Sequence, residues 1–314
     1  MRHPSYQQIY EWEDIFCDML KASLTIDTDI APLATHFGNF YNMLPLVTHK
    51  TAFVFDMNPF YRMSNHNNRT NIIPCIIDFY SFNEEDLKQF YQKYSDNKLI
   101  FISSLEVYNW LKSKGCPLNI QPLALSISDK YRISSNTLFE KKYDVLLMGR
   151  QNPVLQTWLD EYEKTHGNLV VALCKKENGH YNYYTRQGDF VGNADKREGV
   201  IDLLRKSRIG LYSTKGMDSD CKQYDLHGFT HVTPRFFEFI ASGCHIISRY
   251  IQNAETNWFQ LEQISENTES YIEFEQQMNY ALTHSVDMVK YSSYLENHYT
   301  SKRVIQVQET LKNL

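Results

Sequence analysis

The chain of 314 residues lacks the features that would place it in a membrane or outside the cell. No apolar run approaches the roughly 18 residues of a membrane-spanning helix, and the opening MRHPS leads into a polar segment instead of a signal-peptide core. The six cysteines form no CxxC pair, so we expect reduced, mostly buried thiols. These absences favour a cytoplasmic protein, and they leave attachment to the inner face of the membrane open.

The chain also lacks an excess of basic charge, internal repeats and low-complexity tracts. Its formal net charge is −5, which argues against a nucleic-acid binder because such proteins normally carry a basic face. What it has is a hydrophobic fraction of 42% and a charged fraction of 22%, the balance of a globular protein. A single compact core is hard to build at this length, so two domains are expected.

Short apolar runs recur along the chain and alternate with helical patterns. Several of them are apolar without alternation, which is typical of parallel strands covered on both faces. Strand–helix–strand alternation at this spacing predicts βαβ units and an α/β fold. The predicted strands are residues 51–56, 72–77 and 99–102 in the first half, and 143–148, 169–173, 208–212 and 244–248 in the second.

Three of the predicted helices have sequence signals at their starts. Ser103 followed by Glu106 forms a capping-box pattern, and Gly115 is expected to end that helix. Pro153 is placed at the first helical position of a second helix, where its missing N–H costs nothing. Asn193 is the expected N-cap of a third helix, which leads into the strand at 208–212.

The polar stretch 128–142 has no sustained apolar period and precedes a new strand, so we place a domain boundary there. This gives an N-terminal domain of residues 1–130 and a C-terminal domain of residues 143–314, with the last helix returning to the first domain. Two doubly wound domains of this kind face each other across a cleft. Ligands bind there because the carboxyl ends of the parallel strands meet at that edge of each sheet.

The most informative segment is 230–248, with the sequence THVTPRFFEFIASGCHIIS. Thr233 is suited to the N-cap of a helix, Pro234 to its first position and Gly243 to its end. Arg235 and Glu238 are three residues apart and therefore share one face of this helix.

A helix N-terminus favours a phosphate, and the planar guanidinium of Arg235 can bind a diphosphate through two hydrogen bonds. Glu238 is placed to accept hydrogen bonds from sugar hydroxyls. The alternative is an ordinary ion pair between Arg235 and Glu238 on an exposed face of the helix.

The run TPRFFEFIASGCHIIS resembles the R-x-F-E-x-x-A-x-G segment of GT-B-fold glycosyltransferases, especially the group related to spore-maturation and capsule-polysaccharide transferases. In that family the glutamate matching Glu238 binds the ribose of the nucleotide, and the basic residue matching Arg235 lies by the phosphates. The resemblance implies an α/β protein of two Rossmann-like domains facing across a cleft. The first domain would take the acceptor and the second the nucleotide-sugar.

Further segments are similar to the same family. Residues 143–150 (YDVLLMGR) resemble the first strand and loop of the nucleotide-binding domain. Residues 297–303 (NHYTSKR) resemble a late H-T-Y-x-x-R element, with Tyr299 and Thr300 in swapped order. In the first half, FISSLEVYNWLKSKG followed by IQPLALSIS is similar to the end of the acceptor domain. Many members carry an earlier glutamate in an E-x(7)-E pattern, and Thr230 stands at that position here.

Other polar residues follow predicted strands, at the edge where such sheets bind ligands. Gly149 and Arg150 stand where a strand meets a helix and are candidates for binding the donor phosphates. Lys215 follows the strand at 208–212 and either neutralises phosphate or belongs to an ordinary loop. Thr233 completes the donor-binding set, together with Arg235 and Glu238 described above.

No metal is expected. Asp218 and Asp220 form a D-x-D, which holds a divalent ion in a different transferase fold, but no other feature favours that fold. His231 lies near Asp225 and His227, and their spacing matches no standard zinc pattern.

For the catalytic base that an inverting transfer needs, the first half offers His36, His49 and Asp56. His36 stands close to Gly38, which lets a ligand approach the backbone, and we select His36 and Asp56. A histidine satisfied within the fold is the alternative for His36.

These observations predict a metal-independent glycosyltransferase of the hexosyltransferase type, acting in polysaccharide biosynthesis. It would move a sugar from a UDP- or GDP-linked donor to a glycan, lipid-linked or protein acceptor, without a further cofactor. Two alternatives stay open: a non-catalytic GT-B-like binding or scaffold subunit, and another nucleotide-sugar enzyme such as an epimerase.

Overall fold

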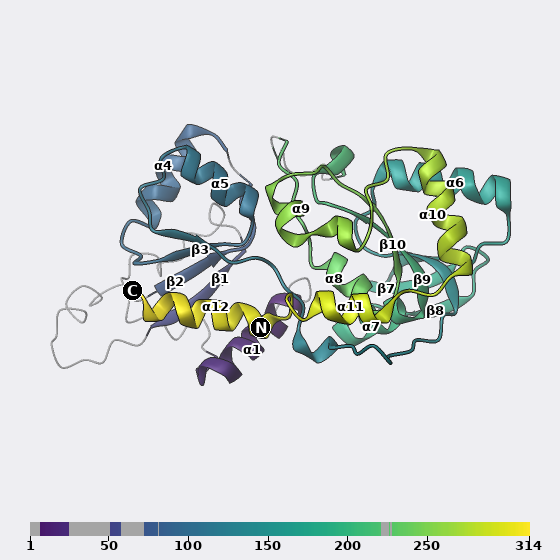
Figure 1. Cartoon of the computed structure of the whole chain (residues 1–314), viewed down its shortest axis with the longest axis horizontal. Coiled ribbons are helices and arrows are strands. Elements are labelled where there is room, and N and C mark those ends of the chain that lie inside the picture. The colour runs from purple at the N-terminus through teal and green to yellow at the C-terminus, as the bar shows by residue number, and fades with distance from the viewer. Residues whose placement is uncertain (1–6, 25–50, 58–71, 81, 221–225, 227) are drawn as a thin grey trace.

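The protein has two α/β lobes, each built around its own sheet (Figure 1). The computed structural model describes residues 7–24, 51–57, 72–80, 82–220, 226 and 228–314. Among the helices of these residues, none reaches the length and apolar character that a bilayer crossing requires.

The first sheet has four parallel strands in the order β1-β2-β3-β4. Its strands are short, and β2 and β3 are buried along their whole length because helices cover both faces. Figure 1 shows one pair of helices above this sheet and another pair below it. The elements are β1 (Ala52–Asp56), β2 (Ile72–Ile76), β3 (Ile100–Ile102) and β4 (Ile120–Pro122), with α4 (Glu84–Lys93) and α5 (Leu105–Ser113) above and α1 (Gln7–Leu20) and α12 (Thr300–Lys312) below.

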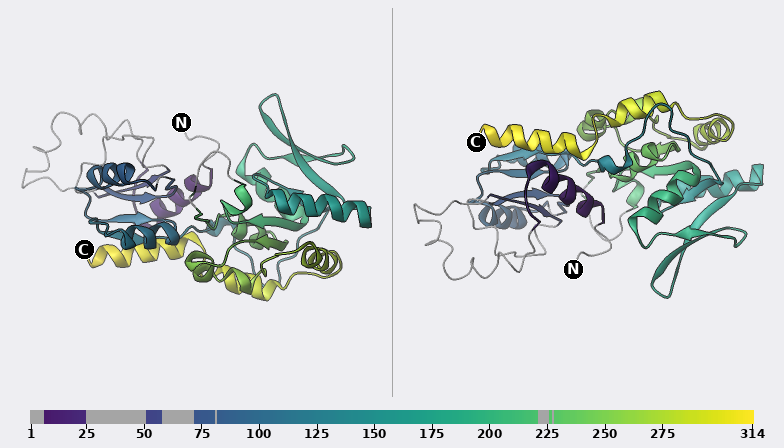
Figure 2. Two further views of the ribbon diagram at one scale, coloured as in Figure 1. Left: turned by 90° about the horizontal axis from the view of Figure 1, so that it is seen from above. Right: turned by 90° about the horizontal axis from the view of Figure 1, so that it is seen from below.

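The second sheet has six strands in the order β10-β9-β5-β6-β7-β8. The first four in this order are parallel, whereas β7 and β8 form an antiparallel hairpin on β6 that extends away from the lobe (Figure 2). The strands are β5 (Tyr143–Leu147), β6 (Val171–Glu177), β7 (His180–Thr185), β8 (Phe190–Asn193), β9 (Ser207–Ser213) and β10 (His245–Arg249).

Helices cover both faces of the second sheet, and one face carries most of the core. That core includes three fully buried phenylalanines of α8, namely Phe236, Phe237 and Phe239. The helices are α6 (Pro153–His166) and α10 (Tyr271–Thr283) on one face, α7 (Arg197–Lys206), α8 (Arg235–Ala241) and α11 (Met288–Leu295) on the other, and α9 (Ala254–Phe259) beside the cleft.

Two crossing segments join the lobes. The linker that leaves β4 pairs with the chain that returns before α12, through a parallel bridge between Ile127 and Tyr299. Arg303 of α12 donates to the carbonyls of Ala124 (2.9 Å) and Leu125 (3.3 Å). Val304 and Val307 then bury their side chains against the first sheet, so α12 belongs to the core of the first lobe although it ends the chain.

The seven strands that the sequence predicts are all present, because continuous apolar runs mark strands covered on both faces. β4 and the β7–β8 hairpin were missed. β4 has only three residues, and β7 (HYNYYT) alternates polar and aromatic residues with an exposed first half, so neither forms an apolar run.

The predicted caps are confirmed at Pro153, which opens α6, and at Gly115, which follows α5 with a φ of +70°. The predicted cap Ser103 is wrong by one residue. Its hydroxyl donates to the carbonyl of Ile77 (2.7 Å), and Ser104 caps α5 by accepting from the backbone of Val107.

Two further caps are corrected. The side chain of Asn193 lies in the hairpin, where it donates to Asn182 (2.9 Å), and α7 starts four residues later without a side-chain cap. Pro234 has helical φ and ψ, as predicted for the first helical position, and the carbonyl of Thr233 accepts the N–H of Phe236 (3.1 Å), but no side chain caps the start of α8.

The centre of β9 is packed too closely to accept a side chain at Gly210. A Cβ added there would lie 2.3 Å from two ring atoms of Phe239. We expect Gly210→Ala to lower the free energy of unfolding by about 2 kcal/mol, as overpacked cores usually do, in urea denaturation. When Phe239→Leu is added, the double variant should lose less free energy of unfolding than the two single variants lose together. Strict additivity of the two losses would contradict this packing.

Candidate functional site

A cavity of about 240 Å³ lies between the two lobes. Segments that follow β1, β2, β3 and β4 of the first sheet and β9 of the second all contribute to its wall. It therefore stands at the carboxyl ends of both sets of parallel strands, where α/β sheets bind ligands. The first lobe supplies Gln8, Ile9, Trp12, Met57, Ile77, Asp78, Phe79, Tyr80, Ser103, Ser104 and Leu125, and the second supplies Lys215, His231, Val232, Thr233, Pro234 and Glu255.

Lys215 and His231 form a rigid pair in this wall. Each donates its backbone N–H to the carbonyl of the other, at 2.8 and 3.0 Å. The ammonium group of Lys215 lies 3.6 Å from the carboxylate of Asp78 and 4.1 Å from the centre of the Tyr80 ring, both in the opposite lobe. The predicted donor residue Lys215 thus places its charge in the cleft.

Three side chains from both lobes meet at the same place. The hydroxyl of Ser104, in the first lobe, is 2.6 Å from Glu255 Oε2 and 2.9 Å from His231 Nδ1. The other oxygen of Glu255 accepts the backbone N–H of Val232 (2.8 Å). The prediction from sequence considered His231 only as a metal ligand and did not include Ser104 or Glu255 among the site residues. These three residues are far apart in the sequence, and only the tertiary fold brings them together.

The two titratable members of this cluster have shifted pKa values. Burial raises the pKa of Glu255 from its ordinary 4.5 to about 7, although the bonds from Ser104 and the backbone oppose the shift. Burial, together with the positive charges of Lys215 and Arg150, lowers the pKa of His231 to about 3. His231 is therefore uncharged at neutral pH.

The predicted ribose-binding residue Glu238 is completely buried in α8. Its carboxylate pairs with Arg197 of α7 at 2.5 Å and with Arg235 at 2.8 Å, and Gln8 of α1 donates to it. Burial by itself raises the pKa of Glu238, but the two guanidinium groups outweigh it and lower the pKa below its usual value. The pair between Arg235 and Glu238 weighed in the sequence is real, but it is buried and shared with a second arginine.

Arg235 and Gly149 are neighbours in the fold. One nitrogen of the Arg235 guanidinium is 3.2 Å from the sulfur of Met148, and another is 3.7 Å from where a side chain on Gly149 would begin. Gly149 has a φ of +74°, which favours glycine at this turn. The structure therefore joins Gly149, Arg235 and Glu238 at the end of β5.

Arg150 points toward the loop that follows β9. It binds the buried carboxylate of Asp220 (2.7 Å) and the carbonyl of Ser213 (3.3 Å). The other acidic residue of the D-x-D motif, Asp218, pairs with Arg249 at 2.5 Å. Within the described part of the chain, no three His, Cys, Asp or Glu side chains gather as metal ligands would.

The remaining predicted residues lie in different places. Thr233 lines the cavity and donates its backbone N–H to the hydroxyl of Tyr212 (3.0 Å). Asp56 ends β1 and accepts the hydroxyl of Tyr94 (2.8 Å), and it is not among the residues that line the cavity. His36 lies outside the described residues.

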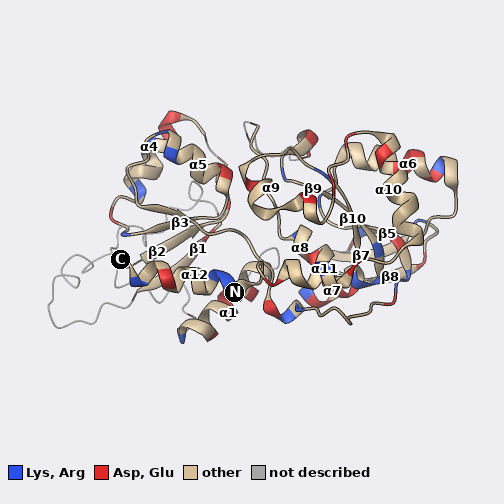
Figure 3. Ribbon diagram, viewed as in Figure 1, with Lys and Arg blue, Asp and Glu red and all other residues tan. Residues whose placement is uncertain are grey.

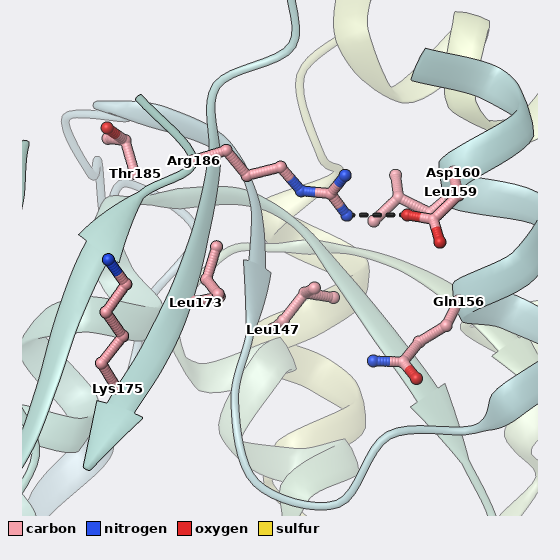
Figure 4. A pocket seen from close by; sticks show the side chains of 8 residues that line it. All are labelled: Leu147, Gln156, Leu159, Asp160, Leu173, Lys175, Thr185 and Arg186. Atoms are coloured by element: carbon pink, nitrogen blue, oxygen red, sulfur yellow. Dashed lines mark hydrogen bonds and ion pairs between the residues drawn. The ribbon is translucent and has the colours of Figure 1, made fainter. Parts of the chain in front are cut away.

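A second, larger cavity of about 490 Å³ lies away from the cleft, between α6 and the strands β5 to β7. Figure 4 shows its apolar floor of Leu147, Leu159 and Leu173, with Arg186 bonded to Asp160 (2.8 Å) at the rim. None of the predicted donor-binding residues lines it.

Residues of both charges are distributed along the ribbon. Figure 3 shows Lys and Arg interspersed with Asp and Glu along both lobes, without a continuous basic stripe on the ribbon in that view.

No family model matches the chain, and no curated protein matches it in sequence. Its fold is nevertheless similar to solved structures. A trehalose-6-phosphate synthase, studied with bisubstrate glycomimetics, shares 10% identity over 99% of this chain and 86% of that chain, with a TM-score of 0.53. A structure described as trehalose-6-phosphate from E. coli bound with UDP-2-fluoro glucose covers 98% and 85%, with 10% identity and a TM-score of 0.53.

AviGT4, a glycosyltransferase involved in Avilamycin A biosynthesis, has a TM-score of 0.50 with 9% identity, over 96% of this chain and 87% of that chain. The chain spans about half (53%) of the matched chains in a GtfA/B complex and in the pneumococcal O-GlcNAc transferase GtfA. At these identities the likeness shows the fold. It is the GT-B arrangement of two Rossmann-like domains across a cleft, as the sequence predicts.

Removing the Glu238 carboxylate leaves Arg235 without this ion-pair partner and leaves the buried Arg197 with Glu11, 3.2 Å from its Nε, as its remaining carboxylate. We expect Glu238→Ala to lower the free energy of unfolding by about 3 kcal/mol or more, measured in urea. The matched control is Glu198→Ala on α7, whose ion pair with Lys130 is exposed and should be worth less than about 1 kcal/mol. Equal losses in the two variants would show that the buried pairs do not stabilise the fold.

The raised pKa of Glu255 makes stability depend on pH. Because the folded-state pKa is about 7 against 4.5 for the ordinary group, the native state holds the proton more tightly, and stability falls as pH rises between these values. The glutamine of Glu255→Gln cannot titrate. The free energy of unfolding of this variant, relative to that of the wild type, should therefore rise by on the order of 3 kcal/mol across this range, at about 1.4 kcal/mol per pH unit.

Free energies of unfolding of both proteins at several pH values measure this difference. Ser104, His231 and Glu106 surround Glu255 and are present in both proteins, so their contributions cancel to first order. A gap between the proteins that stays constant from pH 4.5 to 7 would exclude an elevated pKa.

Proposed function

We propose that the chain is a glycosyltransferase that moves a sugar from a nucleotide-diphosphate donor, UDP- or GDP-linked, to a glycan, lipid-linked or protein acceptor. One observation carries this proposal. In a GT-B fold, the cavity between the lobes is lined at the carboxyl ends of the strands by an ammonium group, a neutral imidazole and aromatic rings. Those groups suit the three parts of a donor at one place: a diphosphate, sugar hydroxyls and the apolar faces of rings.

The second lobe is proposed to bind the nucleotide. Lys215 faces the cleft and would neutralise the diphosphate. Arg235 and the backbone of Gly149, which lie together at the end of β5, would bind the phosphates as well. Arg150 would act partly by holding the loop that carries Lys215, since its partner Asp220 also accepts the backbone N–H of Gly216 (2.8 Å). These cations would stabilise the departing diphosphate without a metal.

The proposed role of Glu238 needs one rearrangement. Arg197 and Gln8 both bind Oε1, whereas Oε2 pairs with Arg235 and is buried without a hydrogen-bond partner. A ribose hydroxyl would therefore bind Oε2, once the surrounding side chains open a path to it. The catalytic base stays a prediction, on His36 or Asp56.

The proposal is tested by thermal unfolding of the protein with UDP-, GDP-, CMP- and ADP-linked sugars, followed by assays of sugar release and transfer. We expect one nucleotide to raise Tm, and Lys215→Ala to remove most of the rise, since a charge-assisted contact to phosphate is worth about 1.5–3 kcal/mol. Lys164→Ala, an exposed lysine on α6, is the matched control and should leave the rise unchanged.

The other outcomes separate the alternatives. A protein that no nucleotide-sugar stabilises is a scaffold or binding subunit with the GT-B fold. A protein that binds a nucleotide-sugar and changes it without releasing the nucleotide is another nucleotide-sugar enzyme, such as an epimerase.

A further inference from the structure

His231 has an unsatisfied nitrogen beside the cavity between the lobes. The side chain is part of the cavity wall, and its Nε2 is buried without a hydrogen-bond partner. A buried polar atom left unpaired costs free energy, and natural proteins tolerate such atoms mainly where a ligand or water completes them. The position of this nitrogen therefore indicates a place for a ligand's polar group.

The partners on the opposite side of the ring decide what Nε2 can bind. Ser104 has one hydroxyl proton, and when Glu255 is ionised, above its pKa of about 7, the 2.6 Å contact with Glu255 Oε2 directs that proton to the carboxylate. The oxygen of Ser104 is then left to accept a proton from His231 Nδ1, 2.9 Å away. With Nδ1 protonated in a neutral ring, Nε2 carries a lone pair and can accept a hydrogen bond from a donor that reaches it.

The charges around the ring keep it neutral. Burial and the cations Lys215 and Arg150 hold the pKa of His231 near 3, so the imidazole does not become positive at physiological pH. A group with so low a pKa is a poor proton acceptor for catalysis, because an effective general base has a pKa near the working pH. Nε2 is therefore suited to bind a hydroxyl and not to remove its proton.

The size and lining of the cavity limit the occupant. About 240 Å³ is below the range of roughly 300–1,000 Å³ that holds a complete small-molecule ligand, so one ring of a larger substrate fits best. Trp12, Phe79 and Tyr80 provide apolar surface, and Lys215 provides a positive charge next to His231. A hydroxylated ring attached to a phosphate matches this combination.

We propose that His231 is a substrate-binding residue that accepts a hydrogen bond from a hydroxyl of the transferred sugar, with Ser104 and Glu255 as positioning residues. The inference rests on the proposed function and assigns the sugar part of the donor to this cavity. Because Ser104 belongs to the first lobe and His231 and Glu255 to the second, the oriented imidazole exists only when the lobes are closed. Recognition of the sugar is thereby coupled to closure of the cleft.

Two substitutions of His231 separate its two nitrogens. The amide of His231→Asn can replace Nδ1 toward Ser104 but does not reach the position of Nε2, whereas the longer His231→Gln can place an amide oxygen there. We measure the affinities of wild type and both variants for UDP and UDP-glucose, and for GDP and GDP-mannose. For whichever nucleotide, UDP or GDP, the protein binds, His231→Asn should lower the affinity for the nucleotide-sugar about tenfold and leave the affinity for the free nucleotide unchanged. His231→Gln should recover most of the lost affinity.

The orientation of the ring is tested without any ligand. Long-range ¹H–¹⁵N spectra of the imidazoles, with His231→Asn identifying the resonance, should show a protonated Nδ1 and an unprotonated Nε2 at about pH 8 and above, where Glu255 is ionised. Ser104→Ala should shift the ring toward a mixture of tautomers, an effect that loss of packing alone would not produce.

The outcomes distinguish failure of the proposed function from failure of the sugar contact at His231. If wild type binds neither nucleotide nor nucleotide-sugar, the proposed function fails and the inference fails with it. If wild type binds both and His231→Asn weakens them equally or not at all, the sugar contact is refuted while the proposed function stands. A protonated Nε2 in the wild-type spectrum would also overturn the inference.

Discussion

The buried carboxylate of Glu238 is the interaction on which the arrangement of the second domain depends. It lies at the centre of a cluster in which Arg197 of α7, Arg235 of α8 and Gln8 of α1 all point to one group. Burying a charge is expensive, so the cluster is stable only if every partner is in place. It therefore fixes α7 against α8 and, through α1, ties the N-terminal helix to the C-terminal domain.

Polar and charged side chains also pair with one another in the cleft, but there they are joined by fewer ion pairs. Lys215 faces Asp78 and Tyr80 across the gap, and His231 reaches Glu255 through Ser104. These contacts join groups on opposite lobes, and His231 Nε2 beside them has no hydrogen-bond partner. A closed cleft with exchangeable polar contacts is what a transferase needs to bind a donor, exclude water and release the product.

Several features of the fold could be predicted because they depend on local sequence. The seven strands appear as apolar runs, and Pro153 and Gly115 mark helix ends through their own backbone preferences. The errors have local causes as well. Ser103 and Ser104 are both good caps, and only the contact of Ser103 with Ile77 decides between them. Asn193 resembles a helix cap in sequence, but in the structure its side chain donates to Asn182 across the hairpin.

By itself, the sequence determined the α/β class and the two-domain GT-B arrangement, and it marked the helix that carries Arg235 and Glu238. It could do so because periodicity, turn residues and a short motif are written in neighbouring positions. Only the tertiary structure decided that Glu238 is shared with Arg197, that Arg150 faces Asp220, and that Ser104, His231 and Glu255 meet in the cleft. These contacts join residues between 41 and 151 positions apart in the sequence. Hydrogen bonds and ion pairs between residues so far apart leave no periodic signal in a single chain.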